Sequence, residues 1–386
     1  MKTNRLVSLF AILVSMPILQ GCNQEEILLE SSQDSQSSAK MMTMINSIYS
    51  KLHPDTRSDA NNFHITNVET KSYDINNDSE TRNDKMLGNS SFDIHTVSID
   101  FGESKGYVIL SDTPGIDHIF YYTEAGCIND TATIAPLKEM IESAPLIAET
   151  IAKNGYVKSY SETRGDLMIG PLVRFQWDQY YPFNYYATYC TCEQCHAMND
   201  HMPAGCVPVA LAQTIATLKH FKGTFYGNRD IDFDSFPSVA SQYENINMVL
   251  SLAHFLQEIA INCQIKYECG GSHSNLYSAT NYLRDLGYDA DIKEGSLDKS
   301  RYIKYLQRGF PHIMGGHNEK KGHAWILDGA MESNGSLQYH INWGFGYTTS
   351  NGWSSECYYG YYFDGKDMVY KNYYKKHTHL YITLPY

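Results

Sequence analysis

The sequence predicts an α+β protein made of two folded units. Its 386 residues exceed the length of one ordinary domain, and 42% of them are apolar, which is enough to form buried cores. Only 19% are charged while tyrosine alone occurs 31 times, a balance typical of a β-containing extracellular protein rather than a charged helical bundle. In the second half of the chain, helical patterns come first and strand patterns follow.

The charge balance excludes one class of partner. The formal net charge is −13, and no stripe of lysine and arginine interrupts this acidic composition. Nucleic-acid affinity comes mainly from basic side chains on phosphates, so we expect no nucleic-acid binding.

The first 22 residues form an export signal. A basic MKTNR precedes the apolar run LVSLFAILVSMPIL, which has signal-peptide length and is too short to span a bilayer comfortably. The following LQGC resembles a bacterial lipoprotein signal, with Cys22 as the lipidated first residue of the mature chain. A plain secretory signal with an incidental cysteine is the alternative. We expect an exported lipoprotein of the outer membrane or cell surface, held to the membrane by acyl chains only.

A flexible tether over residues 23–40 is predicted next, from the polar tract SSQDSQSSAK. The first folded unit is expected over residues 41–164. MMTMINSIYSKL has helical spacing, FDIHTVSIDFG and GYVILSDT indicate strands, and PLKEMIESAPLIAETIAKNGY indicates one or two helices. KNGYVKSYSETRGD, residues 153–166, has few apolar anchors and is the best candidate for a linker open to proteolysis.

The second unit is expected over residues 165–386. Helices are predicted from Cys206 onward, near INMVLSLAHFLQEIAINC and in NLYSATNYLRDLGY. After Pro311 the pattern changes to strands, in HAWILDGAM, LQYHINWGFG, YYGYYF and HLYITLPY. Helices therefore precede the sheet in this unit.

Cys206 lies at the predicted start of a helix, in AGCVPVALAQ. Gly205 allows a tight turn into the helix, and Pro208 fits its first turn, where no amide bond is lost. The partial positive charge of a helix N-terminus lowers a thiol pKa, as does an adjacent imidazolium, so we expect the Cys206 pKa to be depressed. Taken alone, a Gly-Cys pair before a helix also fits an inert buried cysteine.

Two further segments favour a nucleophilic role for Cys206. His323 follows Gly322 at the start of an apolar strand, and Asn342 precedes Trp343 on the next strand. The Asn342 side chain can accept from the far imidazole N–H and fix its tautomer, while Trp343 shields that pair from water. His340 is the competing base.

These segments resemble a known family. The order Cys206, His323, Asn342 resembles that of papain-like cysteine peptidases, whose domain joins a helical part to an antiparallel sheet. GCVPVALAQ, GHAWILDG and YHINWGFG closely resemble three signature blocks of the streptopain family, and WDQYYPFN resembles its block ahead of the nucleophile. The resemblance covers nearly the whole chain, because that family also carries an N-terminal propeptide of about this size.

The resemblance implies a mechanism and a set of residues. Cys206 is the implied nucleophile and His323 the general base and acid, with Asn342 or Trp343 orienting the imidazole. The implied oxyanion hole combines the Cys206 backbone N–H with Gln179, or with Gln176 as the alternative donor. The substrate-binding residues expected at the cleft are Gly205, Gly322, Ser272 and Ser274, although both serines also fit a turn with an N-cap.

The resemblance also implies a zymogen. Residues 41–164 are then an inhibitory propeptide that packs over the cleft, and cleavage near residues 153–166 releases a mature enzyme. Protein or peptide substrates are expected, with the chain's own propeptide as an intramolecular inhibitor. The mechanism requires no metal and no other cofactor.

A cysteine cluster precedes the nucleophile, in YCTCEQCHAMNDH. Cys192 and Cys195 form a C-x-x-C with Cys190 and His196 beside them, a spacing typical of structural zinc. A complete zinc site normally uses a second such cluster, which the sequence does not show. A local disulfide and free loop thiols are the alternatives, and the pairing cannot be deduced from sequence.

Two other functions fit the same residues. A papain-fold transglutaminase or amidase would use this set for acyl transfer to an amine. A catalytically inactive binding module is the second alternative, and the presence of Cys206, His323 and Asn342 argues against it.

Overall fold

The computed structural model describes most of the chain. The described residues are 32–55, 63–75, 91–128, 135–154, 167–196, 199–222, 231–239, 246–269, 271–317, 322–333, 336–346, 351–354, 361–363, 368–370 and 376–385. Cys22 and most of the predicted linker, residues 155–166, lie outside this part.

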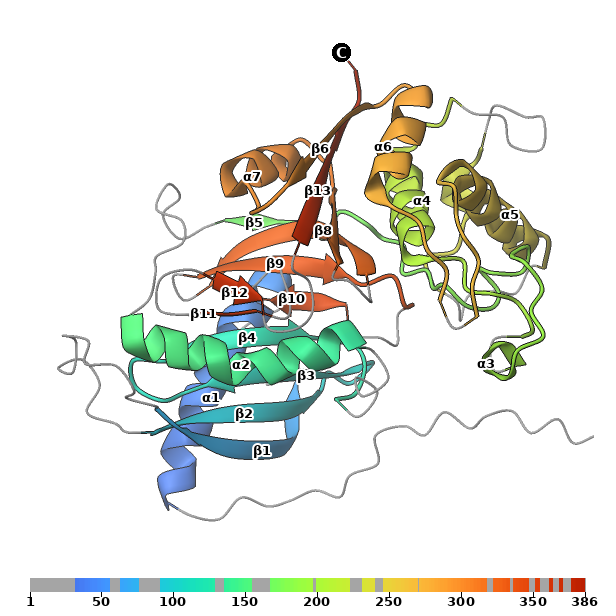
Figure 1. Ribbon diagram of the computed structural model, residues 1–386. Helices are drawn as coiled ribbons and strands as arrows, with labels where there is room; N and C mark the ends of the chain where they lie inside the picture. The colour runs from blue at the N-terminus through green and yellow to red at the C-terminus, as the bar shows by residue number, and fades with distance from the viewer. Residues whose placement is uncertain are drawn as a thin grey trace, which may run out of the picture.

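The first unit is a four-stranded antiparallel meander between two helices. Its strands are β1 (His64–Asp74), β2 (Ser91–Asp100), β3 (Lys105–Ser111) and β4 (His118–Thr123). The helices α1 (Ser32–Leu52) and α2 (Ala135–Asn154) cover opposite faces of this meander (Figure 1). Strand alternation explains the two layers: Val97 and Val108 pack with Ile45 of α1, while Ile109 packs with Ala148 of α2.

The predicted tether over residues 23–40 is wrong for its second half. Helix α1 begins at Ser32, so the Ser/Gln tract is helical from that residue onward. Two contacts hold this end of the helix: Ser37 Oγ donates to Asp112 Oδ2 at 2.6 Å, and Lys40 Nζ donates to the Asp112 carbonyl at 2.6 Å. The polar composition therefore marks a docked helix end. The segment for which one or two helices were predicted forms one helix, α2 (Ala135–Asn154), with Pro145 inside it.

The second unit has a helical part and a sheet part in the predicted order. The helical part contains α3 (Glu193–His196), α4 (Cys206–Leu218), η2 (Phe233–Ser235), α5 (Ile246–Asn262) and α6 (Leu276–Asp285), grouped beside the sheet in Figure 1. The sheet part contains β5 (Met168–Ile169), β6 (Asp289–Glu294), α7 (Lys299–Gln307), β7 (His312–His317), β8 (Gly322–Ser333), β9 (Ser336–Asn342), β10 (Gly352–Ser354) and β13 (Lys376–Thr383). Strands β11 (Tyr361–Phe363) and β12 (Met368–Tyr370) form a separate pair.

The helices predicted from residues 206, 246 and 275 and the strands predicted near residues 323, 337 and 379 are confirmed. Helix α4 is the centre of the helical part. Ten of its residues are buried, and their packing partners include Ala324 and Ile326 of β8. An apolar helix with no polar face needs cover on every side, which α5, α6 and the sheet provide.

The two units share one sheet. Its strand order is β1-β2-β3-β4-β10-β9-β8-β7-β13-β6, with β5 paired to β8. The joint is the antiparallel pair β4–β10, where Trp353 lies opposite Tyr122 and Ser354 opposite Tyr121. The first unit therefore extends the sheet that carries β8 and β9.

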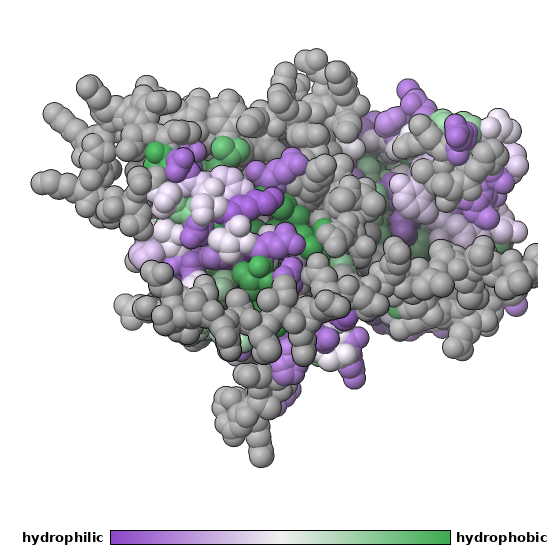
Figure 2. Space-filling view, turned by 90° about the horizontal axis from the view of Figure 1, so that it is seen from below, coloured by the Kyte–Doolittle hydropathy of each residue, from purple (hydrophilic) through white to green (hydrophobic). Residues whose placement is uncertain are grey.

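The outer edge of this sheet is polar. Most side chains of β1 are exposed or half-buried, among them Glu69 and Lys71. Figure 2 views the protein from the end where β1 lies, and hydrophilic residues there are interspersed with hydrophobic ones. Charged side chains on an edge strand disfavour pairing with another chain. Among the described residues, no helix has the length and apolar character needed to cross a bilayer.

Candidate active site

Helix α4 sets the position of Cys206. The helix begins at this residue, and Gly205 before it has φ 92°, a left-handed conformation that favours glycine. A Cβ atom on Gly205 would lie 2.6 Å from Ile265 Cδ1 and would displace the end of that side chain, so the backbone conformation is the main reason for glycine there. The predicted tight turn into the helix is therefore present. It presents the thiol at the first turn of a helix of which ten other residues are buried.

Strand β8 brings His323 to the same place. Its next residue, Ala324, directs a backbone N–H to the Cys206 sulfur, so the nucleophile candidate lies against the start of β8. Cys206 and His323 both line one cavity of about 250 Å³. The helical part supplies one wall of this cavity and the sheet supplies the other. The structure thus brings together the two residues that are 117 positions apart in the sequence.

The predicted substrate-contact residues are also present in this cavity. Ser272, Ser274 and Gly322 line it together with Cys206 and His323. Ser274 Oγ donates to the Cys263 carbonyl at 2.6 Å, which commits that hydroxyl to holding the loop. Ser272 is buried and its hydroxyl has no protein partner in the described chain. Of the two serines, Ser272 is therefore the one with a free hydroxyl at the cavity. Gly205 is not among its lining residues.

The imidazole of His323 is oriented by a backbone carbonyl. Its Nε2 lies 3.0 Å from the Trp343 oxygen, and a carbonyl can only accept, so Nε2 carries the proton. The lone pair is then on Nδ1, the nitrogen left for a thiol proton. The ring also stacks on Phe345, with 5.0 Å between ring centroids. Phe345 was missed at the sequence level, although it stands two residues after Trp343 in the same block.

Burial keeps the thiol and the imidazole neutral. It raises the pKa of Cys206, against the backbone N–H groups that lower it, and it lowers the pKa of His323 to about 4. The expectation of a depressed Cys206 pKa is therefore wrong for this conformation. In the described part of the chain, no hydrogen bond joins the two side chains, so a charged thiolate–imidazolium pair is not formed.

Asn342 does not orient His323, contrary to the expectation for that residue. Its Nδ2 donates to the Phe175 carbonyl at 2.8 Å and to Gln213 Oε1 at 3.2 Å, and its Oδ1 accepts from Gly344 N. The strand register explains this, because Asn342 lies opposite Ile326 on β8, three residues beyond His323. The orienting group is the carbonyl of the next residue, Trp343.

Gln213 connects three parts of the site, and sequence reasoning missed it. This fully buried side chain lies two turns after Cys206 on α4. Its Oε1 accepts from Trp177 N at 3.0 Å and from Asn342 Nδ2. One amide therefore ties the nucleophile helix to the segment before it and to β9. A glutamine within the largely apolar stretch VALAQTIA was the available signal.

His340, the competing base, is excluded by its position. Its Nδ1 lies 2.6 Å from Oδ1 of the buried Asp328, whose other oxygen accepts from Val173 N. His340 is not among the residues that line the cavity. This imidazole therefore has a structural partner away from Cys206.

Gln179 and Gln176, the two candidate side-chain donors to the oxyanion, are held in different places by their backbone hydrogen bonds. The Gln179 carbonyl accepts from Ala204 N at 2.7 Å, which places Gln179 beside the segment that leads to Cys206. The Gln176 backbone instead donates to the Ser238 carbonyl. Asp178 Oδ1 accepts from the Gln179 N–H at 2.5 Å and fixes the turn at that residue. The arrangement favours Gln179 over Gln176.

The first unit approaches this site from the side of Trp343. The Trp343 Nε1–H donates to the Tyr121 hydroxyl of β4 at 3.4 Å. Thr123 Oγ1 donates to the Asn351 carbonyl. None of the described residues of the first unit lines the Cys206 cavity. The expectation that this unit packs over the cleft is therefore not met by its described part, because β4 joins the sheet edge at β10 instead.

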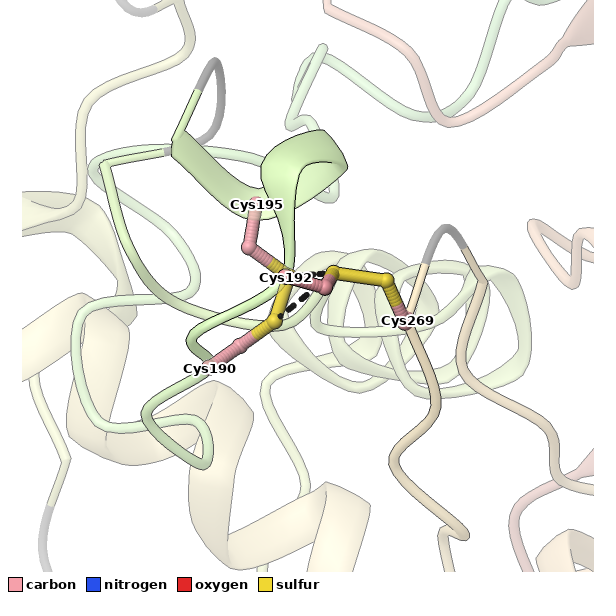
Figure 3. A group of neighbouring side chains, drawn as sticks. All are labelled: Cys190, Cys192, Cys195 and Cys269. Carbon is pink, nitrogen blue, oxygen red and sulfur yellow. Dashed lines mark hydrogen bonds between the residues drawn. A yellow bond between two sulfur atoms is a disulfide. The ribbon is translucent and has the colours of Figure 1, made fainter.

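The cysteines before α4 form two disulfides. Cys190 bonds to Cys195, and Cys192 bonds to Cys269, which lies after α5 (Figure 3). The local-disulfide alternative is confirmed for the first pair. The role of Cys269 was missed, because 77 residues separate it from Cys192. Cys206 and Cys263 are free thiols.

Comparison with known proteins agrees with this geometry. Residues 177–354 match the model of the Peptidase C10 family. A fragment of Prevotella intermedia prointerpain A, in a mutant form, is similar in structure with a TM-score of 0.52 at 16% identity, over 68% of this chain and 88% of that one. Active wild-type interpain A of the same organism gives a TM-score of 0.41 at 17% identity, over 55% of this chain and 94% of that one. No curated protein matches the chain.

The prointerpain match shows the fold. It covers 68% of this chain, which is more than the second unit alone contains. The expected α+β architecture, a papain-like domain preceded by an α+β unit, is therefore confirmed. The family match covers the segment that carries the WDQYYPFN block, Cys206, His323 and Trp343. The match over residues 177–354 thus supports a streptopain-like cysteine peptidase domain in this part of the chain.

Proposed function

We propose that this protein is an exported cysteine endopeptidase made as an inactive precursor. Cys206 acts as nucleophile and His323 as general base and acid, with the Trp343 carbonyl orienting the imidazole. The observation that carries the proposal is the shared cavity, in which a thiol at a helix start and a strand-borne imidazole lie on facing walls. Protein and peptide chains are the substrates.

The chemistry follows from the tautomer of His323. With Nε2–H donated to Trp343, Nδ1 takes the Cys206 proton and the thiolate adds to the scissile carbonyl. The oxyanion accepts from the Cys206 N–H and the Gln179 amide, an interaction that contributes roughly 3 kcal/mol per donor. His323 then protonates the leaving amine and activates water, which hydrolyses the thioester and restores the thiol.

The first unit keeps the enzyme inactive through Trp343. Tyr121 contacts the Trp343 indole, and β4 pairs with β10 next to Asn351, whose Oδ1 accepts from Trp343 N. These contacts fix the carbonyl that holds His323 while burial keeps His323 and Cys206 neutral. Loss of the first unit lets Trp343 and His323 move together with their hydrogen bond kept, so that Nδ1 approaches the thiol. The fold likeness to a protein named prointerpain supports this precursor role.

Activation is by cleavage between residues 153 and 166, performed by the enzyme itself. The precursor is exported by residues 1–22 and carries its lipid on Cys22, at the outer membrane or cell surface. Cleavage separates residues 165–386 from the lipid, so the mature enzyme is released unless β4 and β10 stay paired.

The test compares the chain without residues 1–22 with the same chain carrying Cys206→Ala. Both are incubated under reducing conditions, with and without an epoxide inhibitor of cysteine peptidases, and examined by mass spectrometry. We expect the unmodified chain to trim itself to a fragment that begins between residues 150 and 170 and then to carry the inhibitor on Cys206. The Cys206→Ala chain stays whole.

Two outcomes would contradict the proposal in different ways. Inhibitor on Cys206 of the uncut chain would mean that the site is active without cleavage, which removes the precursor role. No inhibitor on Cys206 even after an added protease has removed the first unit would mean that the thiol is structural, which removes the nucleophile.

A further inference from the structure

Four cysteine sulfurs meet at one point outside the Cys206 cavity. They belong to Cys190, Cys192, Cys195 and Cys269, and all four Sγ atoms lie within 4.8 Å of one another (Figure 3). Sulfurs that are not bonded to each other are also close: 3.1 Å separates Cys190 from Cys192, and 3.4 Å separates Cys192 from Cys195. Two independent disulfides do not require such convergence.

The convergence fits a single tetrahedral ion. Zinc binds four thiolates at about 2.3 Å, which puts neighbouring sulfurs about 3.8 Å apart on the edges of the tetrahedron. The sulfurs that are not bonded to each other, at 3.1 and 3.4 Å, already lie close to that spacing, and the two bonded pairs would separate on reduction. Soft thiolate ligands in this number select zinc over harder cations such as calcium or magnesium.

The backbone holds three of these sulfurs together independently of the disulfides. Cys195 N donates to the Cys192 carbonyl at 2.9 Å, and Cys190 N donates to the Asp200 carbonyl at 2.8 Å. Asp200 N in turn donates to the Cys195 carbonyl at 2.9 Å, which closes the loop. Cys190 and Cys195 are buried, so reduction of their bond would leave two thiols facing each other.

The fourth sulfur comes from a second ordered segment. Cys269 lies in the turn after α5, where Lys266 and His273 exchange two backbone hydrogen bonds of 2.7 and 2.8 Å. This ladder fixes both ends of the turn without help from the sulfur atoms. The C-x-C-x-x-C segment therefore provides three ligands, and Cys269 provides the fourth from a distant part of the sequence. No second cluster of cysteines is needed.

We propose that Cys190, Cys192, Cys195 and Cys269 form a structural zinc site in the reduced protein, and that the two disulfides are its oxidised, metal-free form. The ion takes no part in peptide hydrolysis. It joins the loop of residues 189–201 to the turn that leads into Ser272, so either form of the site fixes a wall of the cavity.

The two forms interconvert by thiol–disulfide exchange. A low-molecular-weight disulfide such as oxidised glutathione accepts the electrons: two molecules of it and four protons give four molecules of reduced thiol. The four thiolates lose four electrons, form two S–S bonds and release one zinc ion. Zinc release and thiol loss therefore occur in the ratio of one to four.

The experiment uses the chain without residues 1–22 that carries Cys206→Ala, so that no self-cleavage occurs. The protein is reduced without oxygen, freed of reductant and titrated with zinc and, separately, with cobalt(II). We expect one ion per chain and, for cobalt, an intense thiolate charge-transfer band with the visible bands of a tetrahedral ion. Oxidised glutathione should then release that ion as the thiols of Cys190, Cys192, Cys195 and Cys269 are lost, which mass spectrometry of alkylated peptides locates.

Matched variants locate the site. Cys192→Ser with Cys269→Ser removes two ligands and should weaken zinc binding at least about 10-fold. Cys263→Ser, which removes a buried thiol outside the cluster, should leave binding unchanged. The proposal fails if the folded, reduced chain binds no zinc, or if it binds cobalt without the charge-transfer band. It also fails if the double variant binds as tightly as its parent.

Discussion

Cys206 and Cys263 are both free thiols in the second unit, yet their surroundings differ. Cys206 starts α4, lines a cavity and touches the strand that carries His323. Cys263 follows α5 and is enclosed in the apolar core, where burial raises its thiol pKa to about 12. The pair shows that a cavity and a nearby base distinguish a nucleophile from a packing residue, since burial alone raises the pKa of both.

The largest expected effect comes from removing each thiol in turn. Cys206→Ala should lower peptidase activity of the processed enzyme by at least about 10³-fold, because no group remains to form the thioester. Cys263→Ala should keep activity within a few-fold and lower stability by about 1 kcal/mol through lost packing. Hydrolysis of a peptide substrate and thermal unfolding measure the two effects. Equal activities in the two variants would remove the distinction between these thiols.

The same comparison can be made for the general base, between His323 at the cavity and His340 away from it. His323→Gln should lower activity by about 10²- to 10⁴-fold with little change in stability, because the amide keeps a donor near Trp343 but cannot take a proton. His340→Gln should instead lower stability by about 2 kcal/mol, since Asp328 loses a close partner in a buried position. The reverse pattern, with activity lost in His340→Gln alone, would make His340 the base.

Much of the site could be predicted from local sequence signals. A glycine, a cysteine and an early proline predict a helix start at Cys206, and His323 stands at the beginning of an apolar strand pattern. The role of Asn342 could not be predicted, because it depends on a three-residue offset in the β8–β9 register. Gln213 and Cys269 were missed for a similar reason: their partners are distant in the sequence and are chosen by tertiary packing.

In the fold, too, local features could be predicted from the sequence and features that depend on tertiary packing could not. Helices and strands with strong periodicity were predicted, including α5 and β2. The joining of two units into one sheet was not, because the β4–β10 pair involves a strand of only three residues, Gly352–Ser354. A polar composition also misled the interpretation of residues 32–40, where contacts to Asp112 stabilise a helix that composition alone does not favour.

The third prediction concerns thiol labelling in the intact precursor. Alkylation of Cys206 should rise steeply with pH across the alkaline range, because burial raises its pKa and the thiolate is the reactive form. Cys263 should be labelled about 10-fold or more slowly, in line with its deeper burial. Removal of the first unit should shift the Cys206 profile toward lower pH. An unchanged profile would mean that the first unit does not control this thiol.

The last prediction concerns Asp178, which fixes the turn of Gln179 and affects stability with no direct part in the chemistry. Burial raises the pKa of this carboxyl to about 6, against the backbone N–H groups of Gln179 and Tyr180 that lower it. The folded chain therefore holds the Asp178 proton more tightly than the unfolded chain, whose carboxyl has a pKa near 3.8. This group makes the protein less stable as pH rises from about 4 to about 6, by at most about 3 kcal/mol, and contributes no further change above that range. Asp178→Asn keeps an oxygen for both N–H donors and should remove this loss, so its stability should exceed that of the parent at pH 7 but match it at pH 4. Thermal unfolding at the two pH values measures the difference, and an equal gain at both would mean that the Asp178 charge is not its cause.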